Sequence, residues 1–142
     1  PAVGFAGAIG QPDATAGELP CAYVELVAGA TVTPRELADH AASRIPERAA
    51  VPKHVEVLPE LPKTAVGKVF KPDLRKHAIT RIYNEALLKA SCAARVEHVI
   101  DDKKRGLVAQ IEANGASDAE IVAVLGAFTR PWEHSPAQVA AE

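Results

Sequence analysis

The chain contains no methionine, only two cysteines and few aromatic residues among its 142 residues. At 4% aromatic content, a core must be built from Ala, Val, Leu and Ile, which the 48% hydrophobic content can supply. Cys21 and Cys92 stand far apart and in no metal-ligand spacing, so they predict reduced thiols in a cytoplasmic protein. A chain that begins at Pro1 and has no Met is expected to be a piece of a longer protein.

An excess of positive charge and long apolar runs are lacking as well. Sixteen basic residues against eighteen acidic ones give a net charge of −2, which argues against nucleic acid as a main partner. No apolar stretch approaches membrane-spanning length, and no signal peptide opens the chain. The five histidines form no pair at ligand spacing with a carboxylate, so we expect no metal site.

Local patterns predict an α+β protein. Thr33-Pro34-Arg35-Glu36 combines an N-cap, a proline at the first helical position and a capping box, and Ser117-Asp118-Ala119-Glu120 repeats the capping box. Pro72 is expected to open a third helix, with Leu74, Ala78, Ile82 and Ala86 along one face. Short apolar or alternating segments predict strands at residues 6–9, 21–27, 54–57, 95–100, 107–112 and 128–132.

The most informative segment is Pro62-Lys63-Thr64-Ala65-Val66-Gly67-Lys68. Glycine relaxes the backbone of a loop, and a lysine beside it is a flexible charge with three donors, suited to phosphate or carboxylate. The segment is no P-loop, since Pro62 and Val69 stand where that motif needs Gly and Ser or Thr. A solvated surface lysine is the alternative interpretation.

The run from Ala50 to Lys71, which contains this segment, resembles the C-terminal domain of acyl-CoA synthetases, members of the adenylate-forming (AMP-binding) superfamily. Upstream, the segments 8–13 and 17–24 fit the same domain, so the resemblance covers roughly residues 1–80. Val66 stands where relatives often have Ser or Gly, and Lys71 where they often have Arg.

The resemblance implies that Lys68 is catalytic in forming the acyl-adenylate. It implies ATP and coenzyme A as cofactors, with Mg²⁺ bound mainly by a missing N-terminal adenylation domain, and a carboxylic acid as substrate. Gly67 is expected to place Lys68, and Thr64 to brace the loop or contact a phosphate. Lys53 is expected either to reach the phosphates of coenzyme A or to form an exposed ion pair. Lys68 should then be exposed on a loop, and so open to acetylation.

We therefore expect two parts: residues 1–80, a small mixed sheet with packed helices, and residues 81–142, an α+β extension like half of a ferredoxin-like fold. The function indicated is the mobile C-terminal domain of an acid–thiol ligase, inactive by itself. Two alternatives stay open at this point. One is an adenylating domain that loads a carrier protein, and the other is a non-catalytic binding or regulatory module in which Lys68 is incidental.

Overall fold

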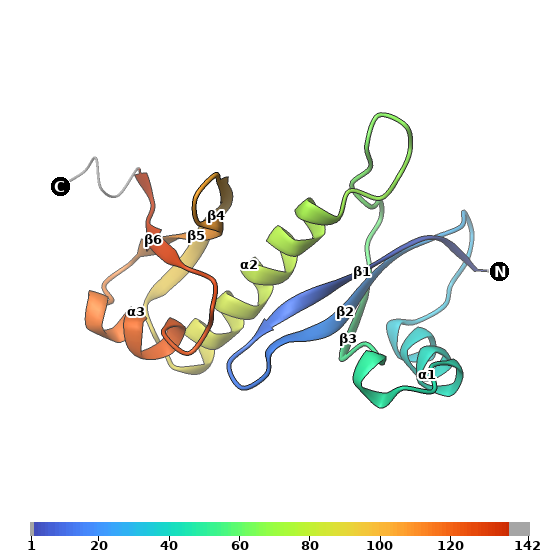
Figure 1. The fold of residues 1–142 in the computed structure, drawn as a ribbon, viewed down its shortest axis with the longest axis horizontal. Helices are drawn as coiled ribbons and strands as arrows, with labels where there is room; N and C mark the ends of the chain where they lie inside the picture. The colour runs from blue at the N-terminus through green and yellow to red at the C-terminus, as the bar shows by residue number, and fades with distance from the viewer. Residues whose placement is uncertain (1, 137–142) are drawn as a thin grey trace. The chain divides into compact units, whose positions relative to one another are not determined.

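The computed structural model describes residues 2–136 and has the predicted α+β class. It divides into two compact units, a first unit of residues 1–11 and 18–75 and a second unit of residues 12–17 and 76–142. Figure 1 shows the order of the elements along the chain. The division expected at residue 80 falls inside a helix and stays a prediction about where the two domains meet.

The first unit contains a sheet of three strands in the order β1-β2-β3. β2 and β3 run parallel, in a register that pairs Cys21 with His54 and Val24 with Val57. Between them, Thr33 caps α1 through the predicted reciprocal pair with Glu36. The elements are β1 (Val3–Asp13), β2 (Gly17–Leu26), α1 (Pro34–Arg44), the 3-10 turn η1 (Arg48–Ala50) and β3 (His54–Val57).

β1 is longer than expected, and one of its glycines is needed for packing. A Cβ atom at Gly7 would lie 2.5 Å from Leu74 Cδ1 and 3.0 Å from Val69 Cγ1. Leu74, at the start of α2 (Lys71–Lys89), is 1% exposed. A Cβ atom at Gly7 would therefore force the buried Leu74 side chain to move, so Gly7 makes room for that side chain in the core of the first unit.

The helix α2 follows the predicted face only in its first turns. Leu74 and Ala78 are buried as expected, but the buried row then continues through Ile79, Tyr83 and Leu87. The expected Ile82 is only partly buried. Ile79, Tyr83 and Leu87 also stand four apart, but Tyr83 is rotated by about 180° around the helix from Leu74, and these three residues pack in the core of the second unit.

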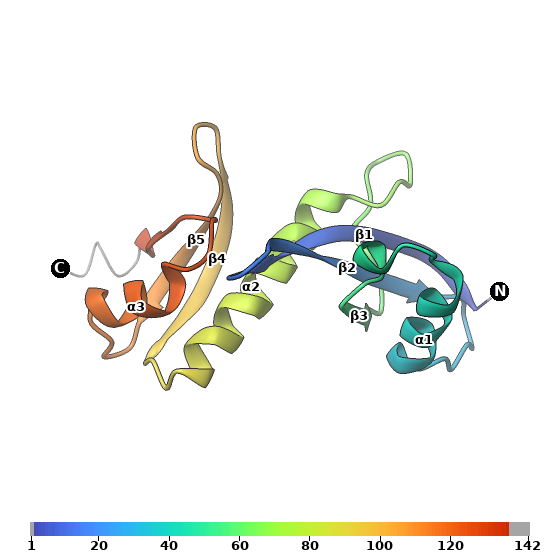
Figure 2. The same cartoon turned by 60° about the horizontal axis from the view of Figure 1, so that its bottom comes forward.

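The second unit is a helix–hairpin–helix–strand arrangement. Its sheet has the order β4-β5-β6, with β4 and β5 antiparallel and β5 and β6 parallel; Figure 2 shows β4 and β5 as a long twisted hairpin. Its elements after α2 are β4 (Ala94–Asp102), β5 (Gly106–Ala113), α3 (Asp118–Leu125) and β6 (Trp132–His134). One hydrophobic core joins these parts, formed by Ile79, Tyr83, Leu87, Val96, Leu107, Ala109, Ile111, Ile121 and Leu125.

The last strand lies later than the sequence indicated. We expected residues 128–132, but β6 begins at Trp132, directly after Pro131. Proline has no N–H to donate to a ladder, and its carbonyl instead accepts from Ala109 N at 3.0 Å before the pairing of β6 begins. β6 is the direct neighbour of β5, so no further strand lies between the two strands that α3 connects. Within residues 2–136, no helix is both long and apolar enough to cross a membrane.

Candidate functional site

The lysine-containing segment forms a narrow loop between β3 and α2, which projects from the first unit in Figure 1. Two contacts join the limbs of the loop at its base, which we call the neck. Lys63 and Val69 form an antiparallel bridge, and the N–H of Phe70 donates to the carbonyl of Pro62 at 2.7 Å. The loop is therefore a small hairpin with its two limbs joined at the base.

Thr64 braces the loop from within, which was one of its two predicted roles. Its N–H donates to the carbonyl of Lys68 at 2.7 Å, and its carbonyl accepts from Gly67 N at 2.9 Å. Its Oγ1 accepts from the N–H of Lys68 at 3.2 Å. The hydroxyl thus has a structural partner, and the backbone of Lys68 is tied to Thr64 at both its N–H and its carbonyl.

Gly67 supplies the backbone conformation that turns the chain into Lys68. Its φ is +85°, in the left-handed region that glycine adopts at little cost. No heavy atom lies within 4 Å of where its Cβ would be. The glycine is therefore required by the backbone angle and not by close packing.

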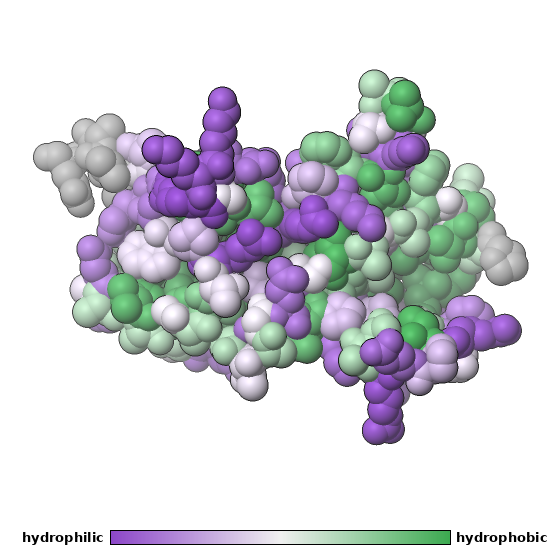
Figure 3. All heavy atoms as spheres, viewed as in Figure 1, coloured by the Kyte–Doolittle hydropathy of each residue, from purple (hydrophilic) through white to green (hydrophobic). Residues whose placement is uncertain are grey.

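Lys68 is exposed on this loop, as predicted. Within residues 2–136 its ammonium makes no ion pair and no hydrogen bond, and only its backbone is held. Beside it, Val66 leaves 81% of its surface exposed. In Figure 3 the projecting loop carries apolar side chains at its tip. A free cation next to an exposed apolar tip is an arrangement that can enter a site on another domain.

Two residues that the sequence reading did not select hold the neck of the loop. Glu25 Oε1, on β2, accepts from Leu61 N at 2.8 Å and from Lys63 Nζ at 2.7 Å. The ammonium of Lys63 also donates to the carbonyl of Leu61 at 3.3 Å and lies 4.5 Å from the centre of the Phe5 ring. A lone acid in the apolar run of residues 22–27 was the signal that could have predicted a buried partner.

The electrostatics of Glu25 follow from these contacts. The hydrogen bond from Lys63 lowers the pKa of the Glu25 carboxyl below its ordinary value of 4.5, and the hydrogen bond from Leu61 N acts in the same direction. Both donors favour the charged form of the carboxylate. Glu25 is therefore ionised at neutral pH and paired with a lysine at the base of the loop.

Lys53 lies apart from the lysine loop. It is exposed and lines an open surface hollow of about 600 Å³ whose lining residues come from α1, η1 and the segment before β3. Arg48 lines the same hollow, so two cations meet there beside the apolar side chains of Ile45 and Val51. The structure thus separates Lys53 from Thr64, Gly67 and Lys68, which share one loop.

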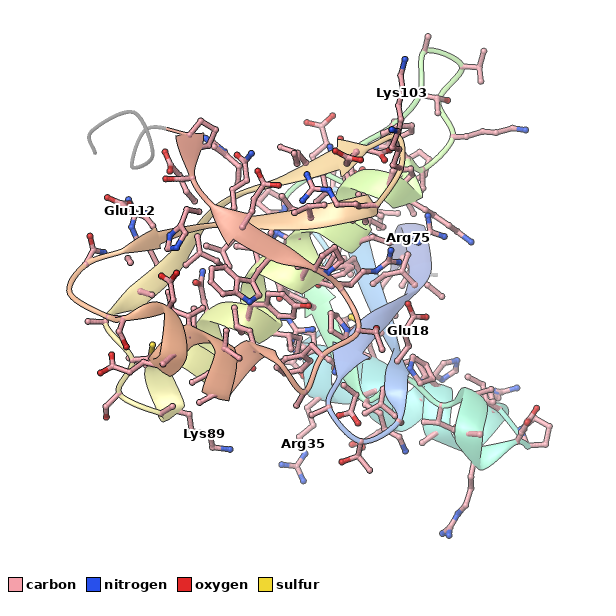
Figure 4. The ribbon with its side chains drawn as sticks, turned by 60° about the vertical axis from the view of Figure 1, so that its left-hand side comes forward. Glu18, Arg35, Arg75, Lys89, Lys103 and Glu112 are labelled. Carbon is pink, nitrogen blue, oxygen red and sulfur yellow. The ribbon has the colours of Figure 1, made fainter. Side chains whose placement is uncertain are left out.

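Charged groups at the turn between β4 and β5 form structural pairs. At the β4–β5 turn, Asp102 Oδ1 accepts from the N–H groups of Lys104 and Arg105 at 2.9 and 3.0 Å, and Arg105 pairs with Glu133 at 2.6 Å. Figure 4 shows Lys103 pointing away from this turn, as expected of a solvated hairpin tip. Among residues 2–136, no group of three or more His, Cys, Asp or Glu could hold a metal ion.

Comparison with known proteins places the loop in a recognised domain. Residues 1–68 match the family described as the AMP-binding enzyme C-terminal domain. The match ends at Lys68, so it contains the loop from Pro62 to Lys68 together with Glu25 and Lys63, but not Val69 and Phe70, which close the loop at its base.

Similar proteins are ligases and acyl-activating enzymes. A marinolic acid–CoA ligase of Pseudoalteromonas sp. is 40% identical over 109 residues, which are 75% of this chain and 16% of the ligase. Probable acyl-activating enzyme 8 of Arabidopsis thaliana is 41% identical over 80 residues, 55% of this chain and 14% of that protein. The crystal structure of the anthranilate CoA ligase AuaEII with anthranoyl-AMP has a TM-score of 0.51 at 29% identity, covering 58% of this chain and 16% of its own.

The extent of these matches bears on both units. The chain spans only about one sixth of the length of the marinolic acid–CoA ligase. A similarity that runs over 109 residues is longer than residues 1–80, so it extends into the second unit.

Proposed function

Because residues 1–68 match the AMP-binding enzyme C-terminal domain, we propose that this chain is the C-terminal part of an acyl-CoA synthetase and that it brings Lys68 to the site of acyl-adenylate formation. The observation that supports this most is the loop itself: Lys68 has a fixed backbone and an exposed ammonium that has no partner within residues 2–136. A structural lysine has no need of this combination, whereas a residue that must enter another domain's site does.

The chemistry proposed has two steps. In the first, a carboxylate oxygen of the acid attacks the α-phosphorus of ATP, the bond to pyrophosphate breaks, and acyl-AMP forms. In the second, the thiol of coenzyme A loses its proton and attacks the acyl carbonyl, and AMP leaves. Negative charge accumulates on the phosphate oxygens in the first step, and an ammonium placed there stabilises that charge. We assign Lys68 to the first step only.

The other residues have supporting roles in this proposal. Thr64 and Gly67 shape the loop that carries Lys68. Lys53, with Arg48 in the same hollow, is proposed to contact the phosphates of coenzyme A in the second step. Lys53→Ala should therefore raise the KM for coenzyme A and leave pyrophosphate release unchanged. Mg²⁺ is proposed to be held mainly by the N-terminal adenylation domain, together with ATP and the acid.

The experiment that tests the proposal is ATP–pyrophosphate exchange with a panel of carboxylic acids. Full-length enzyme should exchange label with at least one acid, and the 142-residue chain alone should not. Exchange by the purified chain, or none by the full-length enzyme with any acid, would contradict the proposal, the second result favouring a non-catalytic module. Offering coenzyme A and a phosphopantetheinyl carrier protein in parallel then tests which thiol accepts the acyl group; the names of the relatives favour coenzyme A.

A further inference from the structure

The contacts at the neck of the loop support an inference that goes beyond the role of Lys68. β3 ends at Val57, and the last pairing with β2 is the bond from Leu58 N to the carbonyl of Val24 at 2.9 Å. Beyond this point the chain contains Pro59 and Pro62, which have no N–H to donate. Two of the four residues from Pro59 to Pro62 therefore cannot donate a backbone hydrogen bond to the sheet.

The side chain of Glu25 holds the segment that leads to the loop. Its Oε1 binds the N–H of Leu61, a residue that is 1% exposed, and the ammonium of Lys63. Glu25 and Lys63 each expose only 19% of their side chains, so the pair is partly shielded from water. Exposed ion pairs contribute little to stability, but a shielded, charge-assisted pair that also binds the backbone is held more firmly.

Lys63 links the contact with Glu25 to the opposite limb of the loop. Its backbone is bridged to Val69, the residue after Lys68. Its ammonium has a carboxylate, a carbonyl and the face of Phe5 around it, so it is not available to a substrate phosphate. The two lysines of the loop thus differ in environment: Lys63 is bound to Glu25 on β2, whereas the ammonium of Lys68 has no partner in the part of the chain that the structure describes.

We propose that the Glu25–Lys63 ion pair holds Lys68 at a fixed distance and in a fixed orientation relative to the sheet of the first unit. This inference rests on the function proposed above, because it assigns the pair a role in the adenylation step alone. Neither residue touches substrate. A shift of about 1 Å in a group that must meet a transition state is enough to lower the rate about a hundredfold.

Substitutions in the full-length enzyme test the proposal. Lys63→Met removes the ammonium and leaves the bond between Glu25 and Leu61. It should lower kcat for adenylation by about tenfold to a hundredfold, without changing the KM for the acid or the rate of thioester formation from pre-made acyl-adenylate. Glu25→Gln keeps an acceptor oxygen but no charge, so its loss should be smaller and in the same step.

Matched variants separate positioning from general damage. Lys63→Arg keeps the charge and should retain most of the rate. Glu60→Gln removes the other carboxylate near Lys63, which lies 4.0 Å away with 82% of its side chain exposed, and should change nothing. Combining Glu25→Gln with Lys63→Met should cost no more than Lys63→Met alone, because both act through one contact.

The outcomes distinguish the two proposals when Lys68→Ala is measured alongside. If Lys68→Ala leaves adenylation intact, the proposed function is wrong. If Lys68→Ala abolishes adenylation but Lys63→Met does not change it, only the positioning role is wrong. Equal losses in both half-reactions for Lys63→Met, accompanied by a lower melting temperature, would make the pair a purely structural contact and overturn the inference.

Discussion

Thr64 binds both the backbone N–H and the backbone carbonyl of Lys68. The N–H of Lys68 donates to Thr64 Oγ1 at 3.2 Å, and the carbonyl of Lys68 accepts from Thr64 N at 2.7 Å. The backbone of Lys68 therefore has little freedom, although its side chain is exposed. This relationship fixes where the lysine starts and leaves its ammonium free to reach a partner, which is the arrangement that the proposed adenylation role requires.

Gly67 should tolerate asparagine better than alanine. Its φ of +85° is a left-handed conformation, and open space surrounds the position of a Cβ. A Cβ there costs roughly 1–2 kcal/mol through backbone strain, whereas asparagine adopts this region more readily. In the full-length enzyme, we expect Gly67→Ala to slow adenylation more than Gly67→Asn does, with the thioester step unchanged in both. Equal rates for the two variants would contradict a conformational role.

The carboxyl of Glu25 should titrate below its ordinary pKa of 4.5, chiefly because Lys63 donates a hydrogen bond to it. A carboxyl whose pKa is lower in the folded state stabilises the fold fully above the unfolded-state pKa and loses that contribution as the pH falls through the folded-state pKa. The first unit should therefore lose stability in acid below about pH 4.5. Lys63→Met should move the pKa of Glu25 upward in an NMR titration, and an unmoved pKa would show that the pair does not form in solution.

Tyr83 should resist ionisation and make the second unit sensitive to alkali. Burial raises the pKa of Tyr83 from 10.0 to about 12, and its hydroxyl donates to the carbonyl of Arg130 at 2.8 Å. The unfolded chain releases this proton at lower pH than the folded chain, so stability is full below pH 10 and falls between pH 10 and about 12. Denaturant titrations across this range should show the decline in wild type. Tyr83→Phe should reduce this loss of stability at high pH. At neutral pH the variant should be about 1 kcal/mol less stable, because the hydrogen bond is lost.

The second unit should unfold cooperatively and depend on its helix cap. Ser117 Oγ accepts from Glu120 N, and a Glu120 carboxylate oxygen accepts from Ser117 N, each at 3.2 Å. Ser117→Ala should destabilise this unit by about 1 kcal/mol. Thr33→Ala removes the same capping box from α1, a helix with no buried residue, and serves as the control. Rapid proteolysis of the wild-type chain back to about residue 80, a boundary uncertain by a few residues, would contradict a folded extension.

Local features such as helix caps and loop residues could be predicted from the sequence. Both capping boxes formed as expected, since a cap depends on residues three positions apart. The lysine loop was also placed correctly, because Pro62 and Gly67 mark it. The position of β6 was missed because packing, not propensity, decides where a short edge strand begins.

Contacts between distant residues could not be predicted in the same way. Glu25 and Lys63 lie 38 positions apart in the sequence, and Gly7 owes its identity to Leu74 on another element. No period or local motif links such pairs, and only the folded sheet brings them together. The sequence therefore indicated Lys68, Gly67 and Thr64 as candidate residues, whose roles stay predictions, whereas the contacts at the neck of the loop required the structure.

The most direct test measures both half-reactions on the Lys68→Ala variant of the full-length enzyme. Acyl-adenylate formation should fall about a hundred- to a thousandfold, the usual cost of removing one electrostatic contact to a transition state. Thioester formation from pre-made acyl-adenylate should stay near the wild-type rate. Lys71→Ala, which removes an exposed lysine three residues later, should leave both steps unchanged. Equal losses in the two half-reactions of Lys68→Ala, or undiminished adenylation, would contradict the role proposed for Lys68.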